Sequence, residues 1–121
     1  MPVDILILGA GWTSIFLIKL CDEREISHSV TSRSGRESTI KFEFDPESDD
    51  LEPYGVLPSA STVLITFPIE KPGASERLVR LYTNSRTDGN LSGELKPRFI
   101  QLGTTGMWDV SRLRFHLILL Y

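Results

Sequence analysis

The sequence has 121 residues, 40% of them hydrophobic, and a formal net charge of -3 at pH 7. Its length and composition fit one soluble globular domain, and the weak acidic balance argues against a nucleic-acid or anionic-membrane partner. No apolar stretch is long enough to span a bilayer, and no basic segment precedes the first apolar run as in a secretory signal. Cys21 is the only cysteine, so intrachain disulfides are excluded and a cytoplasmic location is expected. His28 has no ligand partners at suitable spacing, so no metal site is predicted.

The first predicted elements are a buried strand, a glycine turn and a helix. The apolar run Val3–Leu8 is typical of a parallel strand covered on both faces. An amphipathic helix is predicted from Thr13 to about Arg24. Between them, Gly9 permits a tight turn, and Gly11 lets the backbone come close to a phosphate because it has no side chain.

This turn supplies the first two glycines of the dinucleotide-binding fingerprint G-x-G-x-x-G. Ser14 stands at the third position, where a small side chain still lets the helix lie close to the strand. The free N–H groups at the start of the helix would face a pyrophosphate. A glycine turn can also be purely structural, but its place between a strand and a helix favours a dinucleotide site. The residues predicted to contact the dinucleotide here are Gly9, Ala10, Gly11, Trp12, Thr13 and Ser14.

The second predicted strand, His28–Arg33, ends at about the 20-residue offset where dinucleotide folds select their cofactor. An acidic residue there would bind the ribose hydroxyls of NAD, but this chain has two arginines, Arg33 and Arg36. Ser32 and Ser34 add hydroxyl groups. Because a guanidinium group matches a phosphate, these residues favour NADP(H) over NAD(H) and argue against a flavin of the common type. The alternative is a solvated basic turn.

Two further strands are predicted in the middle of the chain. Thr39–Phe44 alternates apolar and polar residues and ends at Asp45, which would either contact the adenine or cap the following turn. From 47 to 59 the chain is acidic and rich in Pro, Gly and Ser, so we expect a loop with at most one short helical turn. Ser61–Phe67 is strongly β-forming. The residues that would lie beside the glycine turn at its end are Thr66, Phe67 and Pro68.

A helix, a polar loop and a fifth strand follow. The helix is predicted over Ala74–Asn84, the loop from 87 to 97 and the strand over Arg98–Leu102. The succession of strands and helices predicts an α/β fold with a Rossmann-type, doubly wound parallel sheet of order 3-2-1-4-5.

Two segments carry a family resemblance. Ile5–Trp12 and Leu102–Asp109 together resemble the NAD-dependent epimerase/dehydratase branch of the short-chain dehydrogenases/reductases, and more narrowly its atypical NAD(P)-binding members. In those proteins a short Ser/Thr-rich segment with an aromatic residue follows the fifth strand. The resemblance covers Val3 to about Asp109 and corresponds to the N-terminal part of a full family member, which implies a sheet truncated after the fifth strand.

The resemblance implies a mechanism in which a tyrosine acts as general acid or base. A lysine four residues later lowers the pKa of that tyrosine, and a Ser or Thr orients the substrate oxygen. Thr104 is the position that best matches the Ser/Thr, with Thr105 second. No Tyr-x-x-x-Lys occurs in this sequence. We therefore expect a cofactor-binding part of an oxidoreductase or epimerase that is catalytically incomplete.

Residues 1–109 are thus predicted to form an NAD(P)-binding domain, and residues 110–121 an atypical apolar tail. The tail alternates polar and apolar residues as in a half-buried strand, which would pair with a sheet edge or with a partner. A second hypothesis is therefore a non-catalytic NADP(H)-binding module that docks or self-associates through residues 110–121. A third is a fragment without a function of its own.

Overall fold

A computed structural model of the chain describes residues 2–36, 38–69, 71–86, 97–105 and 114–120. The strands of these residues are β1 (Val3–Leu8), β2 (His28–Ser32), β3 (Ile40–Lys41), β4 (Ala60–Ile65), β5 (Arg98–Thr105) and β6 (Arg114–Leu120). The helical elements are α1 (Trp12–Glu23), a short 3₁₀ helix η1 (Glu52–Val56) and α2 (Ala74–Asn84).

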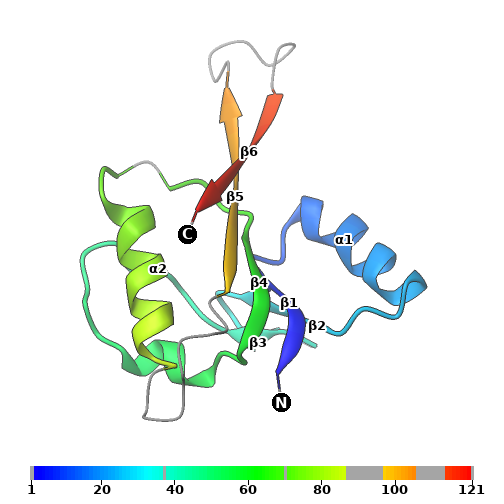
Figure 1. Cartoon of the computed structure of the whole chain (residues 1–121), viewed down its shortest axis with the longest axis horizontal. Coiled ribbons are helices and arrows are strands. Elements are labelled where there is room, and N and C mark those ends of the chain that lie inside the picture. The colour runs from blue at the N-terminus through cyan, green and yellow to red at the C-terminus, as the bar shows by residue number, and fades with distance from the viewer. Residues whose placement is uncertain (1, 37, 70, 87–96, 106–113, 121) are drawn as a thin grey trace.

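These strands form one sheet in the order β3-β2-β1-β4-β5-β6. The first five are parallel and confirm the predicted α/β fold with the order 3-2-1-4-5. Within the tail, β6 pairs antiparallel with β5, so the tail adds a sixth strand at that edge of the sheet. The helices α1 and α2 lie on opposite sides of the sheet, as expected for a doubly wound fold (Figure 1).

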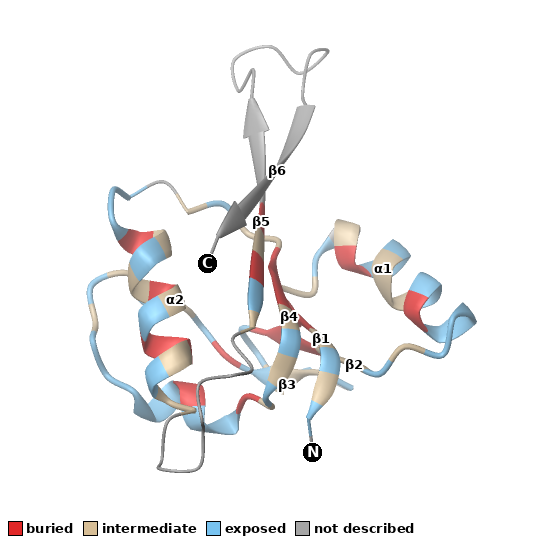
Figure 2. Ribbon diagram, in the orientation of Figure 1, coloured by how far each residue is buried: buried red, intermediate tan, exposed pale blue. Residues whose placement is uncertain are grey.

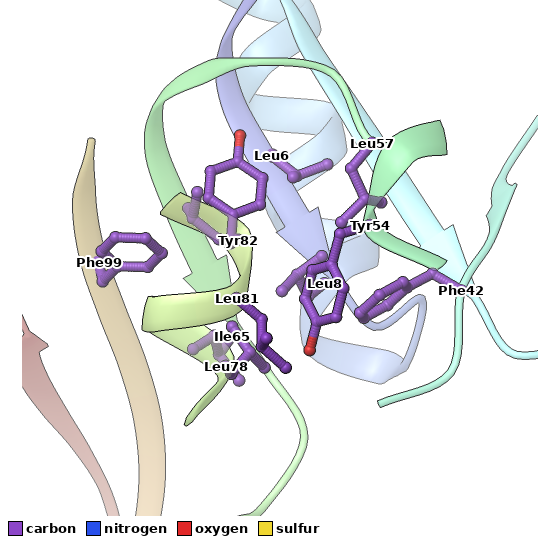
Figure 3. Packing of buried hydrophobic residues seen from close by; sticks show 11 residues of the cluster. Leu6, Leu8, Phe42, Tyr54, Leu57, Ile65, Leu78, Leu81, Tyr82 and Phe99 are labelled. Carbon is purple, nitrogen blue, oxygen red and sulfur yellow. The ribbon is translucent and has the colours of Figure 1, made fainter. Parts of the chain in front are cut away.

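The main hydrophobic core lies between the sheet and α2. Alternate residues of β1 and β4 form one core cluster with residues of α2 and η1. The buried parts of β1, β4 and α2 are red in Figure 2. Tyr82 packs edge-to-face on Phe99, and Phe42 on Tyr54 (Figure 3). The members of this core are Leu6, Leu8, Phe42, Tyr54, Leu57, Val63, Ile65, Leu78, Leu81, Tyr82 and Phe99.

The other face of the sheet is covered by α1. Ile7 is fully buried and pairs in register with Val30 and Leu64, which are buried as well. These residues alternate with the core residues of the same strands and therefore point to the opposite face. On α1, Ser14 and Cys21 are buried. The two sets of buried residues explain why β1 and β4 read as continuous apolar runs.

The third strand is shorter than the predicted Thr39–Phe44. Because β3 lies at the edge of the sheet, only β2 can pair with it, and that pairing ends where Ser32 faces Lys41. The amide of Phe42 still donates to the carbonyl of Ser32, and the chain then leaves the sheet. The polar–apolar alternation therefore predicts burial correctly but overestimates the ladder.

The segment between β3 and β4 is attached to α2. The predicted short helical turn is η1, and the Tyr82 hydroxyl donates to the carbonyl of Pro58 just after it. Arg86 donates to the carbonyls of Tyr54 and Leu57 while its guanidinium lies over the Tyr82 ring. These contacts satisfy backbone carbonyls that a buried loop would otherwise leave unpaired.

The described residues contain neither a helix able to span a membrane nor a cluster of metal ligands. No helix in this part of the chain has both the length and the apolar character that crossing a membrane requires. In the same residues, no group of three or more His, Cys, Asp or Glu side chains is placed to hold a metal ion.

The core predicts a large cost for shortening Leu78, whose side chain is 0% exposed. We expect Leu78→Ala to lower the free energy of unfolding by about 2–5 kcal/mol, because it removes buried methyl groups and leaves a cavity. Urea denaturation measures this change. The matched control is Leu20→Ala on α1, where the side chain is 45% exposed and the expected loss is about 1 kcal/mol or less. Equal losses would contradict this placement of the core.

Candidate functional site

A cleft of about 600 Å³ opens at the carboxyl ends of the parallel strands. Its walls come from the segments that follow β1, β2, β3 and β4, together with Ala74 at the start of α2. In open α/β sheets this edge is where ligands bind, at the point where the strand order reverses. The predicted site residues that line the cleft are Gly9, Ala10, Gly11, Ser32, Arg33, Arg36, Phe67 and Pro68.

The two glycines of the turn differ in whether the fold leaves room for a side chain. Gly9 has a φ of +110°, and a Cβ there would lie 2.4 Å from Thr66 Oγ1, so the fold itself requires glycine. Gly11 has a φ of -92°, and a Cβ there would meet no atom within 4 Å. No packing contact therefore demands the second glycine, and its bare backbone borders the open cleft.

The turn is held by hydroxyl groups of the neighbouring strands. Thr31 at the end of β2 accepts a hydrogen bond from the amide of Gly9 (3.0 Å). Thr66 after β4 donates to the carbonyls of Leu8 (3.0 Å) and Gly9 (3.1 Å). Thr66 thus lies beside the turn as predicted, but it acts on the backbone and lies outside the lining of the cleft.

The start of α1 lies next to the turn. Gly11 is its N-cap and provides no side-chain hydrogen bond to the first helical amides. Ser14 is 1% exposed and donates its hydroxyl to the carbonyl of Gly11 (2.6 Å). A small residue is therefore needed at this position, as the fingerprint predicts, but its hydroxyl is occupied within the turn. Thr13 is half-buried and lies outside the lining, and the side chain of Trp12 lies outside what the structure describes.

Ser32 shapes the loop that carries the two arginines. Its buried hydroxyl accepts hydrogen bonds from the amides of Gly35 (2.9 Å) and Arg36 (3.2 Å). The same oxygen lies 2.7 Å from the hydroxyl of Thr39, which donates to the carbonyl of Arg36. Ser32 therefore lines the cleft but fixes the loop, so that its predicted role toward a cofactor would be one of positioning.

The two arginines differ in their surroundings. Arg36 reaches across to the glycine turn and donates from Nη2 to the carbonyl of Ala10 (2.5 Å). Arg33 is exposed at the cleft, and the described residues offer it neither a hydrogen bond nor an ion pair. Within the described part of the chain, no acidic side chain competes with an anionic ligand for this guanidinium. Ser34 is exposed and lies outside the lining.

Aromatic side chains form an apolar wall of the cleft. Phe44 after β3 stacks on Phe67 after β4, with ring centroids 6.1 Å apart and an interplanar angle of 25°. Phe42 is buried behind them and also borders the cleft. This wall provides flat apolar surfaces of the kind on which a planar base can pack. Asp45 accepts a hydrogen bond from the amide of Glu47 (2.9 Å), which corresponds to the capping alternative, and it lies outside the lining.

Sequence reasoning missed Lys71, which lines the cleft from the segment between β4 and α2. Its ammonium forms an ion pair with the carboxylate of Glu47, from the segment after β3. Among the residues that the structure describes, the charged side chains of the lining are those of Arg33, Arg36, Glu43 and Lys71. A signal was present, because Lys71 follows a predicted strand at the same carboxyl edge as the glycine turn.

Neither Tyr54 nor Tyr82, the tyrosines of the described residues, has the lowered pKa that proton transfer near neutral pH requires. Burial raises the pKa of Tyr54 to about 12, although the nearby Arg77 opposes that shift. Burial also raises the pKa of Tyr82, whose hydroxyl is occupied by the carbonyl of Pro58. Thr104 and Thr105, the predicted substrate-orienting residues, belong to β5, and their side chains lie outside the described part of the chain.

No protein-family model, curated protein or solved structure matches this chain. The resemblance to short-chain dehydrogenases/reductases therefore stays a prediction.

The unequal demands on the two glycines predict unequal effects of alanine. Gly9→Ala should lower the free energy of unfolding by roughly 1–3 kcal/mol, because it forces a side chain into a left-handed conformation and against Thr66. Gly11→Ala should cost less than about 1 kcal/mol, since only the N-cap preference changes. Thermal unfolding of both variants measures the difference. A loss for Gly11→Ala as large as that for Gly9→Ala would show that the second glycine is structural after all.

Proposed function

We propose that the cleft binds NADP(H), with the pyrophosphate at the glycine turn and the 2′-phosphate at Arg33. The observation that carries the proposal is that Gly11, with open space beside it, and Arg33, which has no hydrogen-bond or ion-pair partner among the described residues, line one cleft at the carboxyl edge of a 3-2-1-4-5 sheet. An N–H-rich helix start without a side-chain cap provides donors for the pyrophosphate.

The residues present fit such a group in both charge and shape. Among the described residues of the lining, Arg33, Arg36 and Lys71 carry positive charge, which suits a ligand with several phosphate charges. The wall formed by Phe44 and Phe67 suits the adenine ring. The cleft volume of about 600 Å³ lies within the range of cofactor sites.

The preference for NADP(H) over NAD(H) follows from the loop after β2. An acidic side chain there would accept hydrogen bonds from the ribose and would repel a phosphate. Arg33 instead offers a fork of donors with a fixed positive charge. Arg36 connects the loop to the glycine turn through its hydrogen bond to the carbonyl of Ala10, and both arginines line the same cleft.

On the strength of the family resemblance, we further propose that this cofactor-binding unit belongs to an oxidoreductase or epimerase. A bound nicotinamide would supply a donor or acceptor of hydride. The chain's own described residues would bind and orient the nucleotide, and none of them supplies a proton-transferring tyrosine with a lysine four residues later. We therefore expect cofactor binding with negligible hydride transfer by these residues alone.

Replacing Arg33 tests the cofactor preference. We expect Arg33→Asp to weaken NADPH binding by about tenfold or more, because it removes a charge-assisted hydrogen bond and adds a repelling carboxylate. NADH should lose much less, since it has no 2′-phosphate. Titration of each nucleotide by calorimetry gives both dissociation constants.

The matched control is Arg24→Asp, which makes the same charge change at an exposed residue outside the cleft lining. It should leave the NADPH/NADH ratio unchanged. Equal weakening of both nucleotides by Arg33→Asp would contradict a 2′-phosphate site at Arg33.

A further inference from the structure

We propose that Lys71 is a further phosphate-binding residue of the cleft, held in reserve by Glu47 and released to the ligand when a nucleotide binds. This inference rests on the proposed nucleotide site and adds a third cation to it. Nothing in the glycine fingerprint or in the arginine pair after β2 calls for such a lysine.

The position of Lys71 supports this role. It lines the cleft from the segment that leads from β4 into α2, whereas the two arginines follow β2. The amide of Ala74, the first residue of α2, donates to the carbonyl of Lys71 (3.1 Å). This hydrogen bond holds the backbone of Lys71 next to the start of the helix. Ala74 itself borders the cleft. The ammonium group is thus carried by a fixed backbone while its long side chain can turn.

The present partner of Lys71 is easily exchanged. The Lys71 side chain is 50% exposed and that of Glu47 is 67% exposed, so water screens their ion pair and it contributes little to stability. A phosphate in the cleft would carry more charge than one carboxylate and would attract the ammonium of Lys71 more strongly. Exchange of Glu47 for a phosphate is therefore favoured once the ligand supplies the phosphate.

Two ion pairs near Glu47 share Asp49 and lie away from the cleft. Oδ1 of Asp49 forms ion pairs with Nη1 of Arg77 (2.6 Å) and Nη2 of Arg80 (3.2 Å), both on α2. These three residues lie outside the lining of the cleft. That cluster attaches the loop after β3 to the helix without help from Glu47. The Glu47–Lys71 pair is therefore not needed to hold the loop, and Lys71 can leave it at little cost.

The competing explanation is that the Glu47–Lys71 ion pair only connects the two walls of the cleft. The two explanations predict opposite changes in nucleotide affinity when Glu47 is removed. If the pair only held the two walls together, removing either partner would weaken nucleotide binding equally. If Glu47 competes with the ligand for Lys71, removing Glu47 strengthens binding and removing Lys71 weakens it.

The experiment is a double-mutant cycle on NADPH affinity, read by calorimetry with the full chain. We expect Lys71→Gln to weaken binding by about five- to tenfold, and Glu47→Gln to strengthen it by about two- to fivefold. In the double variant, the Glu47 change should have no further effect, because the lysine it competes for is gone.

Two controls separate this effect from long-range charge. Glu52→Gln removes a carboxylate from the same acidic segment, and Lys19→Gln removes an exposed ammonium on α1; neither residue lines the cleft. Both should change affinity by less than about twofold.

The outcomes also separate this inference from the proposed function. Failure of the unaltered chain to bind NADPH overturns both. Binding by the unaltered chain with equal weakening by Lys71→Gln and Glu47→Gln overturns the role of Lys71 alone and leaves the nucleotide site in place. If Lys71→Gln leaves NADPH affinity unchanged, the role of Lys71 is likewise overturned and the nucleotide site stays in place.

Discussion

The close contact between Gly9 and Thr66 is the constraint on which the site depends. With a φ of +110° and a neighbouring hydroxyl where a Cβ would stand, Gly9 lets the chain turn sharply between β1 and α1. The same hydroxyl donates to the carbonyls of Leu8 and Gly9, so the turn is held as well as permitted. Because β1 lies between β2 and β4, this turn places Gly11 in the open space between the loops that follow those strands.

Much of the fold follows from local patterns in the sequence. The apolar runs of β1 and β4 and the amphipathic pattern of α2 arise from burial on defined faces, and the helix bounds Ala74–Asn84 agree with the prediction. The end of β3 could not be predicted in the same way, because it depends on where its only neighbour, β2, stops. A strand's ladder is a property of two segments, whereas hydrophobic alternation is a property of one.

For the candidate site as well, local sequence patterns predict some residues, whereas others depend on how distant segments fold together. Spacing in the sequence predicts Gly9, Gly11 and Arg33 as site residues, and all three line the cleft, because the turn and the loop after β2 follow directly on the strands that place them. Thr66, Ser32 and Ser14 were assigned to a ligand, but their hydroxyls are occupied by the backbone of this site. Lys71 and the stacked Phe44 were missed, because their place at the cleft depends on how distant segments fold together.

Thermal unfolding of the unaltered chain with rising concentrations of NADPH and, in parallel, NADH tests the central claim most directly. A ligand that binds only the folded state raises Tm by an amount that follows its affinity. With a dinucleotide site that includes Arg33, we expect both nucleotides to raise Tm, and NADPH to raise it clearly more. A cooperative transition that neither nucleotide moves would contradict a dinucleotide site in this cleft.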